Sequence, residues 1–170
     1  MEIRIDSPDP FKQVGEILTK GMNVMDGYYN NPKASNTVLS PDGWLHTGDL
    51  GVLDPDGYLY IKGRSKSLIL GPSGQNIYPE EIEDLLNAQP YIAESLVIER
   101  EGKLVALVYP DAEAMKQNKI SREALLKIIH ETRKQINQQI PAYSQIARIE
   151  IHDEEFEKTP KRSIKRFLYQ

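Results

Sequence analysis

The sequence predicts an α+β protein whose first part is rich in β-strands and whose second part alternates strands with helices. Up to residue 63, short apolar segments are separated by turns at Asp26-Gly27, Asp42-Gly43 and Asp56-Gly57. After Arg64 the spacing of apolar residues becomes that of amphipathic helices placed between strands. This change of pattern places a domain boundary between residues 63 and 64.

The clearest element of the first part is a hairpin. Two apolar segments, residues 52–53 and 58–61, flank the sequence Asp54-Pro55-Asp56-Gly57. Proline presets the backbone of a turn and glycine accepts a positive φ, so this tetrapeptide favours a tight reversal. Alternating residues predict further short strands at residues 2–5 and 15–19.

The helices of the second part are marked by their first residues. Pro79 suits the first position of a helix, and Ser121 is a good N-cap for a longer helix that ends before Pro141. Strands are expected at residues 68–70, 95–99, 104–108 and 147–151. We therefore predict a small α+β domain with a short sheet flanked by helices.

The composition is that of a globular protein. Of the 170 residues, 39% are hydrophobic and 27% are charged, and cysteine is absent, which excludes disulfides and cysteine-ligated zinc. No apolar run approaches the roughly 20 residues of a membrane-spanning helix, and the charged first residues resemble no signal peptide. We expect a cytoplasmic protein, and peripheral association with a membrane stays open.

Charge is unevenly distributed along the chain. The net charge of -4 argues against a nucleic-acid-binding surface. The C-terminal tail is nevertheless basic, with Lys158, Lys161, Arg162, Lys165 and Arg166. Lysines in this tail could neutralise a polyphosphate in a transition state. The alternative is a frayed, solvated terminus.

Residues 42–50 form the first candidate binding segment. A carboxylate beside glycine on a turn can accept hydrogen bonds from a vicinal diol such as ribose, which makes Asp49 the candidate. The alternative is a plain turn at residues 47–49 whose aspartate caps its own backbone. The short basic linker at residues 63–66, which contains Arg64 and Lys66, lies at the predicted boundary, where it either links the two domains or contacts an anionic ligand.

The loop at residues 71–76 contains Gly71 and Gly74. It is not a P-loop, because the Gly-Lys-Ser/Thr ending is missing. Small residues would let its backbone line a passage for an extended ligand arm, and a tight connection is the alternative. No histidine has neighbours spaced for metal binding, so no metal ligand is predicted among His46, His130 and His152.

Taken together and in their order along the chain, the candidate segments described above resemble the late motifs of the adenylate-forming superfamily. This superfamily includes acyl-CoA synthetases, luciferases and the adenylation domains of peptide synthetases. Residues 21–32, 42–44 and 47–50 resemble the end of the large domain. Residues 63–66 resemble the hinge motif, and residues 74–83 resemble the segment after it.

Within this superfamily, Lys66 and residues 74–83 most resemble long-chain fatty-acid CoA ligases, since peptide-synthetase domains usually carry aspartate at the hinge. The resemblance implies a fragment of an acid-thiol ligase that uses ATP and Mg to adenylate a fatty acid and then transfers the acyl group to CoA. Residues 1–63 would be the β-rich end of the large-domain barrel. Residues 64–170 would be a mobile C-terminal domain that rotates about residues 64–66.

The resemblance also assigns residues to roles. It implies that Asp49 and Arg64 bind the nucleotide, that Lys66 is the hinge, and that Gly71 and Gly74 line a tunnel for the pantetheine of CoA. The partners would be fatty acid, ATP, CoA and an N-terminal large domain.

Two departures from the family pattern affect adenylation. The phosphate loop ending in Pro-Lys-Gly and the acid that helps to hold magnesium do not occur in these 170 residues, so the chain alone is expected to be inactive. The family also has a catalytic lysine near its C-terminus, and the alignment places Ser163 at that position. Lys165 and Lys161 flank Ser163 and are the candidates for this role.

Two alternatives stay open. The chain could be a noncatalytic module that binds an adenylate or docks on a partner enzyme. The acyl acceptor could also be the phosphopantetheine arm of a carrier protein in place of CoA.

Overall fold

The computed structural model describes residues 1–170, which divide into two compact units, Met1–Lys66 and Ser67–Gln170. The sequence places the domain boundary slightly earlier, after residue 63. The residues between the two positions complete the last strand of the first unit and enter the short 3-10 turn Ser65–Ser67. None of the helices is long and apolar enough to cross a membrane.

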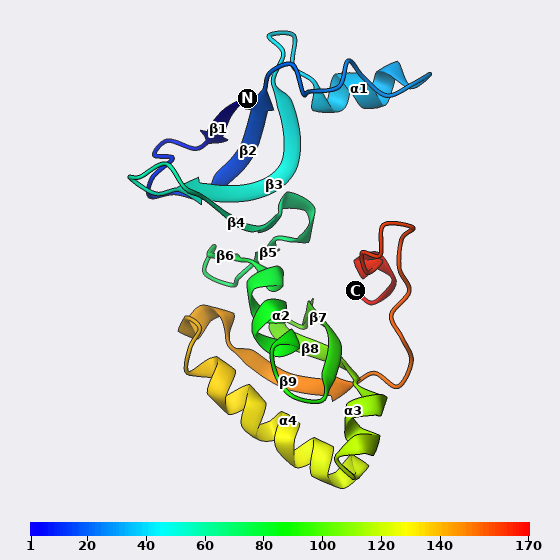
Figure 1. Cartoon of the computed structure of the whole chain (residues 1–170). Helices are drawn as coiled ribbons and strands as arrows, with labels where there is room; N and C mark the ends of the chain where they lie inside the picture. Colours follow the sequence, from blue (N-terminus) through cyan, green and yellow to red (C-terminus); the bar gives the residue numbers. More distant parts are fainter. The chain divides into compact units, whose positions relative to one another are not determined.

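The first unit is built on a four-stranded antiparallel sheet in the order β1-β2-β3-β4 (Figure 1). Its strands are β1 (Glu2–Asp6), β2 (Gly15–Lys20), β3 (Leu45–Leu53) and β4 (Leu59–Arg64). The predicted hairpin is confirmed, because Leu53 lies opposite Leu59 across the turn. Asp54 closes this turn by accepting hydrogen bonds from the backbone N–H groups of Asp56 and Tyr58.

The second unit contains two small sheets and three helices, which confirms the predicted α+β domain with a short sheet flanked by helices. The strands are β5 (Ile69–Leu70), β6 (Asn76–Ile77), β7 (Ile92–Arg100), β8 (Lys103–Pro110) and β9 (Ile146–Ile151). The helices are α2 (Pro79–Asn87), α3 (Ala112–Gln117) and α4 (Arg122–Asn137). In the larger sheet, β8 pairs antiparallel with β7 and parallel with β9.

Both helices predicted in this unit begin at their predicted residues. Pro79 is the first residue of α2, and the Ser121 hydroxyl at the start of α4 accepts the N–H of Ala124 at 3.1 Å. Helix α4 ends at Asn137, before Pro141. These starts follow from proline's fixed φ and from the need to satisfy the free N–H groups of the first turn.

Two short helices are absent from the sequence-based prediction. These are α1 (Pro32–Val38), capped by the Asn31 side chain, and α3, capped by Asp111. Neither helix buries a residue. They therefore lack the apolar periodicity by which a helix is recognised in a sequence.

The larger sheet of the second unit is covered on both faces. The cluster toward the helices consists of Ile77, Ile82, Leu86, Ile92, Val97, Leu104, Ala106, Val108, Ile136 and Ile146. The opposite cluster consists of Leu96, Ile98, Val105, Leu107 and Phe156, with Ile164 and Tyr169 packed against it. Successive residues of a strand point to opposite faces of the sheet, so consecutive residues along β7, and likewise along β8, belong to different clusters. The chain after β9 thus supplies the cover of the second face.

Truncating Leu86 to alanine is expected to destabilise the chain by about 3 kcal/mol, because the side chain is fully buried and the substitution leaves a cavity. Urea unfolding followed by circular dichroism measures this change. The matched control is Leu126→Ala, at a leucine of α4 that is 52% exposed, and its expected effect is within about 0.5 kcal/mol. Equal losses in the two variants would contradict the core described here.

Candidate functional site

Asp49 lies inside strand β3, so the expected turn at residues 47–49 is wrong. The strand runs continuously from Leu45 to Leu53 and accommodates Gly48 at a φ of 74°. A positive φ favours glycine, which has no Cβ, and a glycine beside an aspartate has the residue pattern of a turn. The Asp49 carboxylate does not cap its own backbone but forms an ion pair with Arg64, with Oδ1 3.0 Å from Nη1.

The two nucleotide candidates are thus neighbours on adjacent strands. Asp49 and Arg64 lie directly opposite each other in the β3–β4 pairing. Arg64 Nη1 also donates to the carbonyl oxygen of Thr47 at 3.1 Å, which orients the guanidinium toward Asp49. Both side chains are partly exposed, and Asp49 Oδ2 is available to accept a further hydrogen bond. A diol donor approaching this edge would meet a carboxylate held in place by a cation.

Glu16 on β2 supports the backbone that precedes Asp49. Its Oε2 lies 2.9 Å from His46 Nδ1, and its Oε1 accepts the N–H of Gly48 at 2.9 Å. A single carboxylate therefore holds two positions of β3. Sequence reasoning missed Glu16, because only the β2–β3 register brings it to this segment.

Lys66, the predicted hinge, is exposed in the 3-10 turn that follows β4 and is the last residue of the first unit. Gly71 and Gly74 lie in the tight turn that joins β5 to β6. Gly71 N–H donates to the Gln75 carbonyl at 2.8 Å, and Gly74, at a φ of 82°, donates to the Gly71 carbonyl at 2.9 Å. The tight connection expected as one alternative is therefore present.

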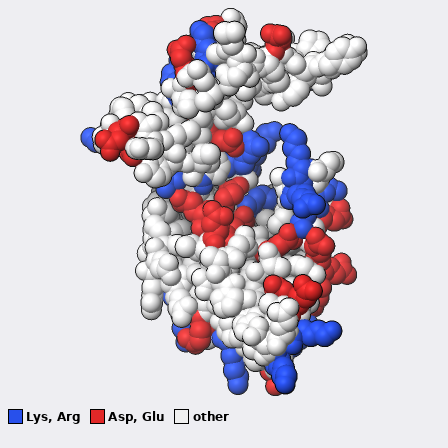
Figure 2. Space-filling model, in the orientation of Figure 1, with Lys and Arg blue, Asp and Glu red and all other residues white.

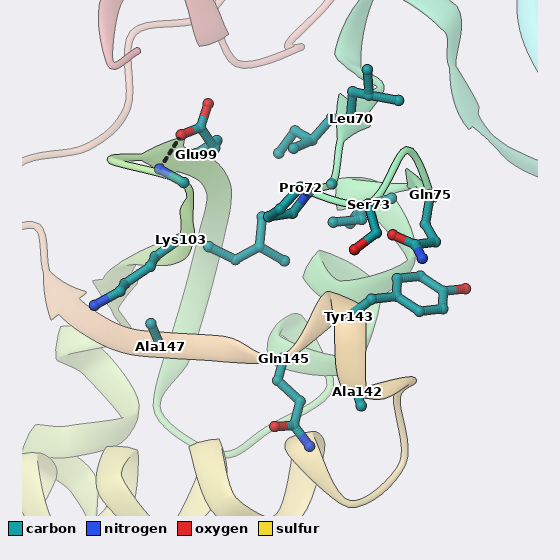
Figure 3. Close-up of a pocket in the computed structure, with 15 residues that line it drawn as sticks. Leu70, Pro72, Ser73, Gln75, Glu99, Lys103, Ala142, Tyr143, Gln145 and Ala147 are labelled. Carbon is teal, nitrogen blue, oxygen red and sulfur yellow. Dashed lines mark hydrogen bonds between the residues drawn. The ribbon is translucent and has the colours of Figure 1, made fainter.

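The same loop borders a hollow of about 500 Å³ within the second unit (Figure 3). Gly71 lines this hollow, whereas Gly74 faces open space. Leu70, Pro72 and Tyr143 contribute apolar surface to it. Its size is in the range of small-molecule sites, so the loop has a ligand-sized space beside it.

The basic tail is folded onto the second unit, so the expectation of a frayed terminus is wrong. Lys158 and Ile164 form an isolated antiparallel bridge. Phe156 is buried and stacks on His152 at 4.8 Å between ring centroids, and Tyr169 meets both rings edge-on. These apolar contacts fix the tail because they remove aromatic surface from water.

The tail's cations differ in how they are paired, and Figure 2 shows basic and acidic groups side by side on the visible face of this unit. The ion pairs are Lys158 with Glu94 and Glu155, Lys165 with Glu157, and Arg166 with Glu80 and Glu83. Lys161 and Arg162 are exposed without an ion pair, next to Ser163 at the tip of the turn. Of the two candidate lysines, Lys165 therefore forms an ion pair with Glu157, whereas Lys161 forms no ion pair.

Arg166 anchors the end of the tail to α2 and β7. Its Nη2 lies 2.5 Å from Glu83 Oε2, and its Nη1 donates to the Val97 carbonyl at 3.2 Å. Glu83 Oε1 accepts the Val97 N–H at 2.6 Å. Burial raises the pKa of Glu83 above its ordinary value, and the charge of Arg166 offsets part of this rise. Sequence reasoning missed this anchor, because its members are far apart along the chain.

This raised pKa predicts how Glu83→Gln changes stability with pH. The folded-state pKa of Glu83 lies above the unfolded value of 4.5. The contribution of Glu83 to the free energy of unfolding is therefore complete below pH 4.5 and is lost as the pH rises through the folded pKa. The neutral variant, which can still accept from Val97, is therefore expected to gain stability relative to wild type as the pH increases above 4.5. Urea unfolding across that range measures the difference, and a constant difference would contradict the assignment.

Comparison with known proteins decides the family. Residues 66–169 match the family described as the AMP-binding enzyme C-terminal domain. The chain belongs to this family. Among curated relatives, indoleacetate CoA ligase of Aromatoleum aromaticum is 50% identical over 98 residues, which cover 55% of this chain and 19% of the relative. The 2-succinylbenzoate CoA ligase of Bacillus cereus is 41% identical over 122 residues, which cover 72% of this chain and 24% of the relative.

A solved structure agrees with this assignment. O-succinylbenzoate coenzyme A synthetase of Bacillus subtilis, in complex with AMP, matches with a TM-score of 0.75 and 29% identity over 99% of this chain and 33% of that chain. The same enzyme has been solved with ATP and magnesium ion, and that structure matches with a TM-score of 0.73 and 30% identity. This chain spans about a fifth to a quarter of the length of the curated relatives named here.

Proposed function

We propose that this chain is the C-terminal part of an ATP-dependent acid:CoA ligase that works with a large N-terminal domain. The ion pair between Asp49 and Arg64 carries the proposal, because it presents an oriented carboxylate to a ribose diol and a cation to the nucleotide. Membership of the family supports it, as do relatives that are CoA ligases by name and a structural neighbour solved with AMP.

The proposed reaction has two steps. A carboxylate attacks the α-phosphate of Mg-bound ATP to form an acyl adenylate and pyrophosphate, and the thiol of CoA then takes the acyl group and releases AMP. One site must first stabilise phosphate charge and then admit a thiol. Rotation of residues 64–170 about Lys66 would meet both needs, since a domain movement exchanges the groups that face the substrate.

For the first step, we assign the positive charge near the reacting phosphate to Lys161 ahead of Lys165. Lys165 would have to leave Glu157, 3.1 Å away, whereas Lys161 has no ion pair. Ser163, at the position where the family carries lysine, cannot supply this charge. Lysine carries its charge at the end of a flexible four-carbon stem, which suits it to a transferring phosphoryl group.

The acid is proposed to be a fatty acid on the resemblance of Lys66 and residues 74–83 alone. The relatives named above act on other acids, according to their names: indoleacetate and 2-succinylbenzoate. A panel of fatty, aromatic and dicarboxylic acids, assayed by release of pyrophosphate, separates these substrate classes.

Titration of the 170-residue chain with AMP, followed by backbone amide shifts, tests the nucleotide site. Shifts are expected around Asp49 and Arg64, and Asp49→Asn should weaken AMP binding and so reduce them, because an amide is a weaker acceptor than a carboxylate. Asp56→Asn is the matched control, at an exposed acid of the β3–β4 turn. If AMP moves the same resonances to the same extent in the Asp49→Asn protein, the ribose contact lies elsewhere.

A further inference from the structure

The chain after β9 turns back on itself near its C-terminal end, as the orange and red segment of Figure 1 shows. The N–H of Thr159 donates to the Ser163 carbonyl at 2.8 Å, and the N–H of Lys165 donates to the Glu157 carbonyl at 2.8 Å. Paired backbone bonds of this kind join the two arms of an antiparallel hairpin. Residues 157–165, which we call the tail hairpin, therefore form an ordered element.

The tip of the tail hairpin carries two cations without acidic partners. Lys161 and Arg162 are exposed and form no ion pair. Arg162 has a φ of 63°, a left-handed conformation that is uncommon outside glycine, and its N–H donates to the Thr159 carbonyl at 2.8 Å. The two cations are therefore carried by a turn of defined backbone conformation.

The first foot of the tail hairpin is attached to the larger sheet. Lys158 Nζ lies 2.6 Å from Oε1 of Glu94 on β7, and both side chains are mostly buried. A second carboxylate, Glu155, lies 2.5 Å from the same ammonium, but it is exposed and belongs to the tail itself. Solvent ions screen a mostly buried pair less than an exposed one. Glu94 is therefore the acid that ties this foot to the rest of the unit.

The second foot is attached through Arg166, the residue that directly follows the tail hairpin. The side chains of Arg166 and its partner Glu83 on α2 are only 19% and 11% exposed. Arg166 also donates to the carbonyl oxygen of Val97 on β7. The tail hairpin is thus held at both feet by carboxylates from elements that precede it by more than sixty residues.

These ion pairs are not needed merely to keep the tail on the sheet. Phe156 and Tyr169 lie on either side of the two feet along the chain, and both pack on the second face of the sheet. Buried ion pairs are weak contributors to stability compared with apolar groups of the same volume, and in some proteins they impose a particular geometry instead. Glu83 and Glu94 act on the segment between the two aromatic residues, which is the segment that carries Lys161.

We propose that Glu83 and Glu94 are positioning residues for acyl-adenylate formation, which hold both feet of the tail hairpin so that Lys161 meets the phosphates of ATP in a fixed place. This inference rests on the proposed ligase function and on the role assigned to Lys161. A charge that is already in place stabilises a transition state without reorganisation during the reaction. Misplacement by about 1 Å can slow a reaction on the order of 100-fold.

Glu83→Gln and Glu94→Gln test this role, because each weakens one foot and leaves every cation of the tail in place. Glu131→Gln is the matched control, which makes the same change of charge at an exposed acid of α4 that pairs with Lys134. In the 170-residue chain, backbone amide relaxation should give order parameters of about 0.8 for residues 161–163. These values should fall below about 0.6 in the two tail variants and stay unchanged in the control.

The rate test joins this chain to the N-terminal part of the Bacillus cereus 2-succinylbenzoate CoA ligase. Each tail variant should lower kcat for pyrophosphate release about tenfold and leave KM for ATP within about twofold of wild type, because the charge is present but misplaced. Thioester formation from supplied acyl adenylate should not change. Net charge alone predicts the opposite sign, since loss of a carboxylate makes the unit more attractive to ATP.

Three results would overturn the positioning role: unchanged order parameters at residues 161–163 in both tail variants, a mobile tip with unchanged kcat, or faster pyrophosphate release in all three variants. Circular dichroism verifies folding, and Glu94→Gln remains decisive if Glu83→Gln unfolds. A folded wild-type chimera that binds ATP but releases no pyrophosphate would reject the ligase function itself. Order parameters that respond to the variants in an active chimera, with kcat unchanged, would reject only the positioning role, so the two failures are distinguishable.

Discussion

Replacing Lys161 by alanine is expected to slow acyl-adenylate formation about 100-fold, the size of effect seen when a group that stabilises transition-state charge is removed. The measurement uses a chimera in which this chain replaces the corresponding C-terminal segment of the Bacillus cereus 2-succinylbenzoate CoA ligase. Pyrophosphate release from ATP and 2-succinylbenzoate reports the first step. The expectation follows from the exposed position of Lys161 and its lack of an ion pair.

Two further variants separate this role from general loss of charge. Lys165→Ala removes an ammonium that is paired with Glu157, so its effect on pyrophosphate release should be smaller than that of Lys161→Ala. Ser163→Lys restores the residue type of the family and should accelerate this step. In all three variants, thioester formation from supplied acyl adenylate should be unchanged, because that step needs no charge from the tail. Equal pyrophosphate release in Lys161→Ala and wild type would reject the assignment.

Replacing Asp49 by alanine is expected to lower kcat/KM for ATP about 50-fold in the same chimera, since hydrogen bonds to a charged acceptor are among the stronger ones. The substitution also leaves Arg64 without the carboxylate that lies 3.0 Å from its guanidinium. Both the proposed diol contact and the orientation of the cation would then be lost.

Asp49→Asn refines this prediction, because it keeps the shape of the side chain and removes its charge. It should be less damaging than Asp49→Ala but still slower than wild type. Asp56→Asn, at an exposed turn in the same unit, should retain full activity. If Asp56→Asn and Asp49→Asn reduce kcat/KM equally, the effect comes from surface charge and not from a ribose contact.

Local patterns predicted the elements that bury apolar residues or use strong turn chemistry. The hairpin around Asp54, the start of α2 at Pro79 and the start of α4 after Ser121 follow from residue types within a few positions. Helices α1 and α3 were missed, because they bury nothing and leave no periodic signal. Asp49 was expected in a turn, because Gly48 introduces turn-like chemistry into what is a continuous strand.

The contacts of the candidate sites depend on long-range pairing and could be predicted only in part. Motif order makes Asp49 and Arg64 candidates, but strand register alone shows that they face each other. Glu16 reaches Gly48 through that same register. Gly71 and Tyr143 come from segments far apart along the chain, so their placement around one hollow has no signature in the sequence.

The most direct test is whether the chimera makes 2-succinylbenzoyl-CoA from 2-succinylbenzoate, ATP and CoA. The N-terminal part of the Bacillus cereus enzyme is assayed alone and joined to this chain, with the complete Bacillus cereus enzyme as the positive control. If this chain is the C-terminal part of an acid:CoA ligase, thioester and AMP appear in the joined protein well above the N-terminal part alone. No gain over the N-terminal part alone, in a folded chimera that binds ATP, would contradict the central claim.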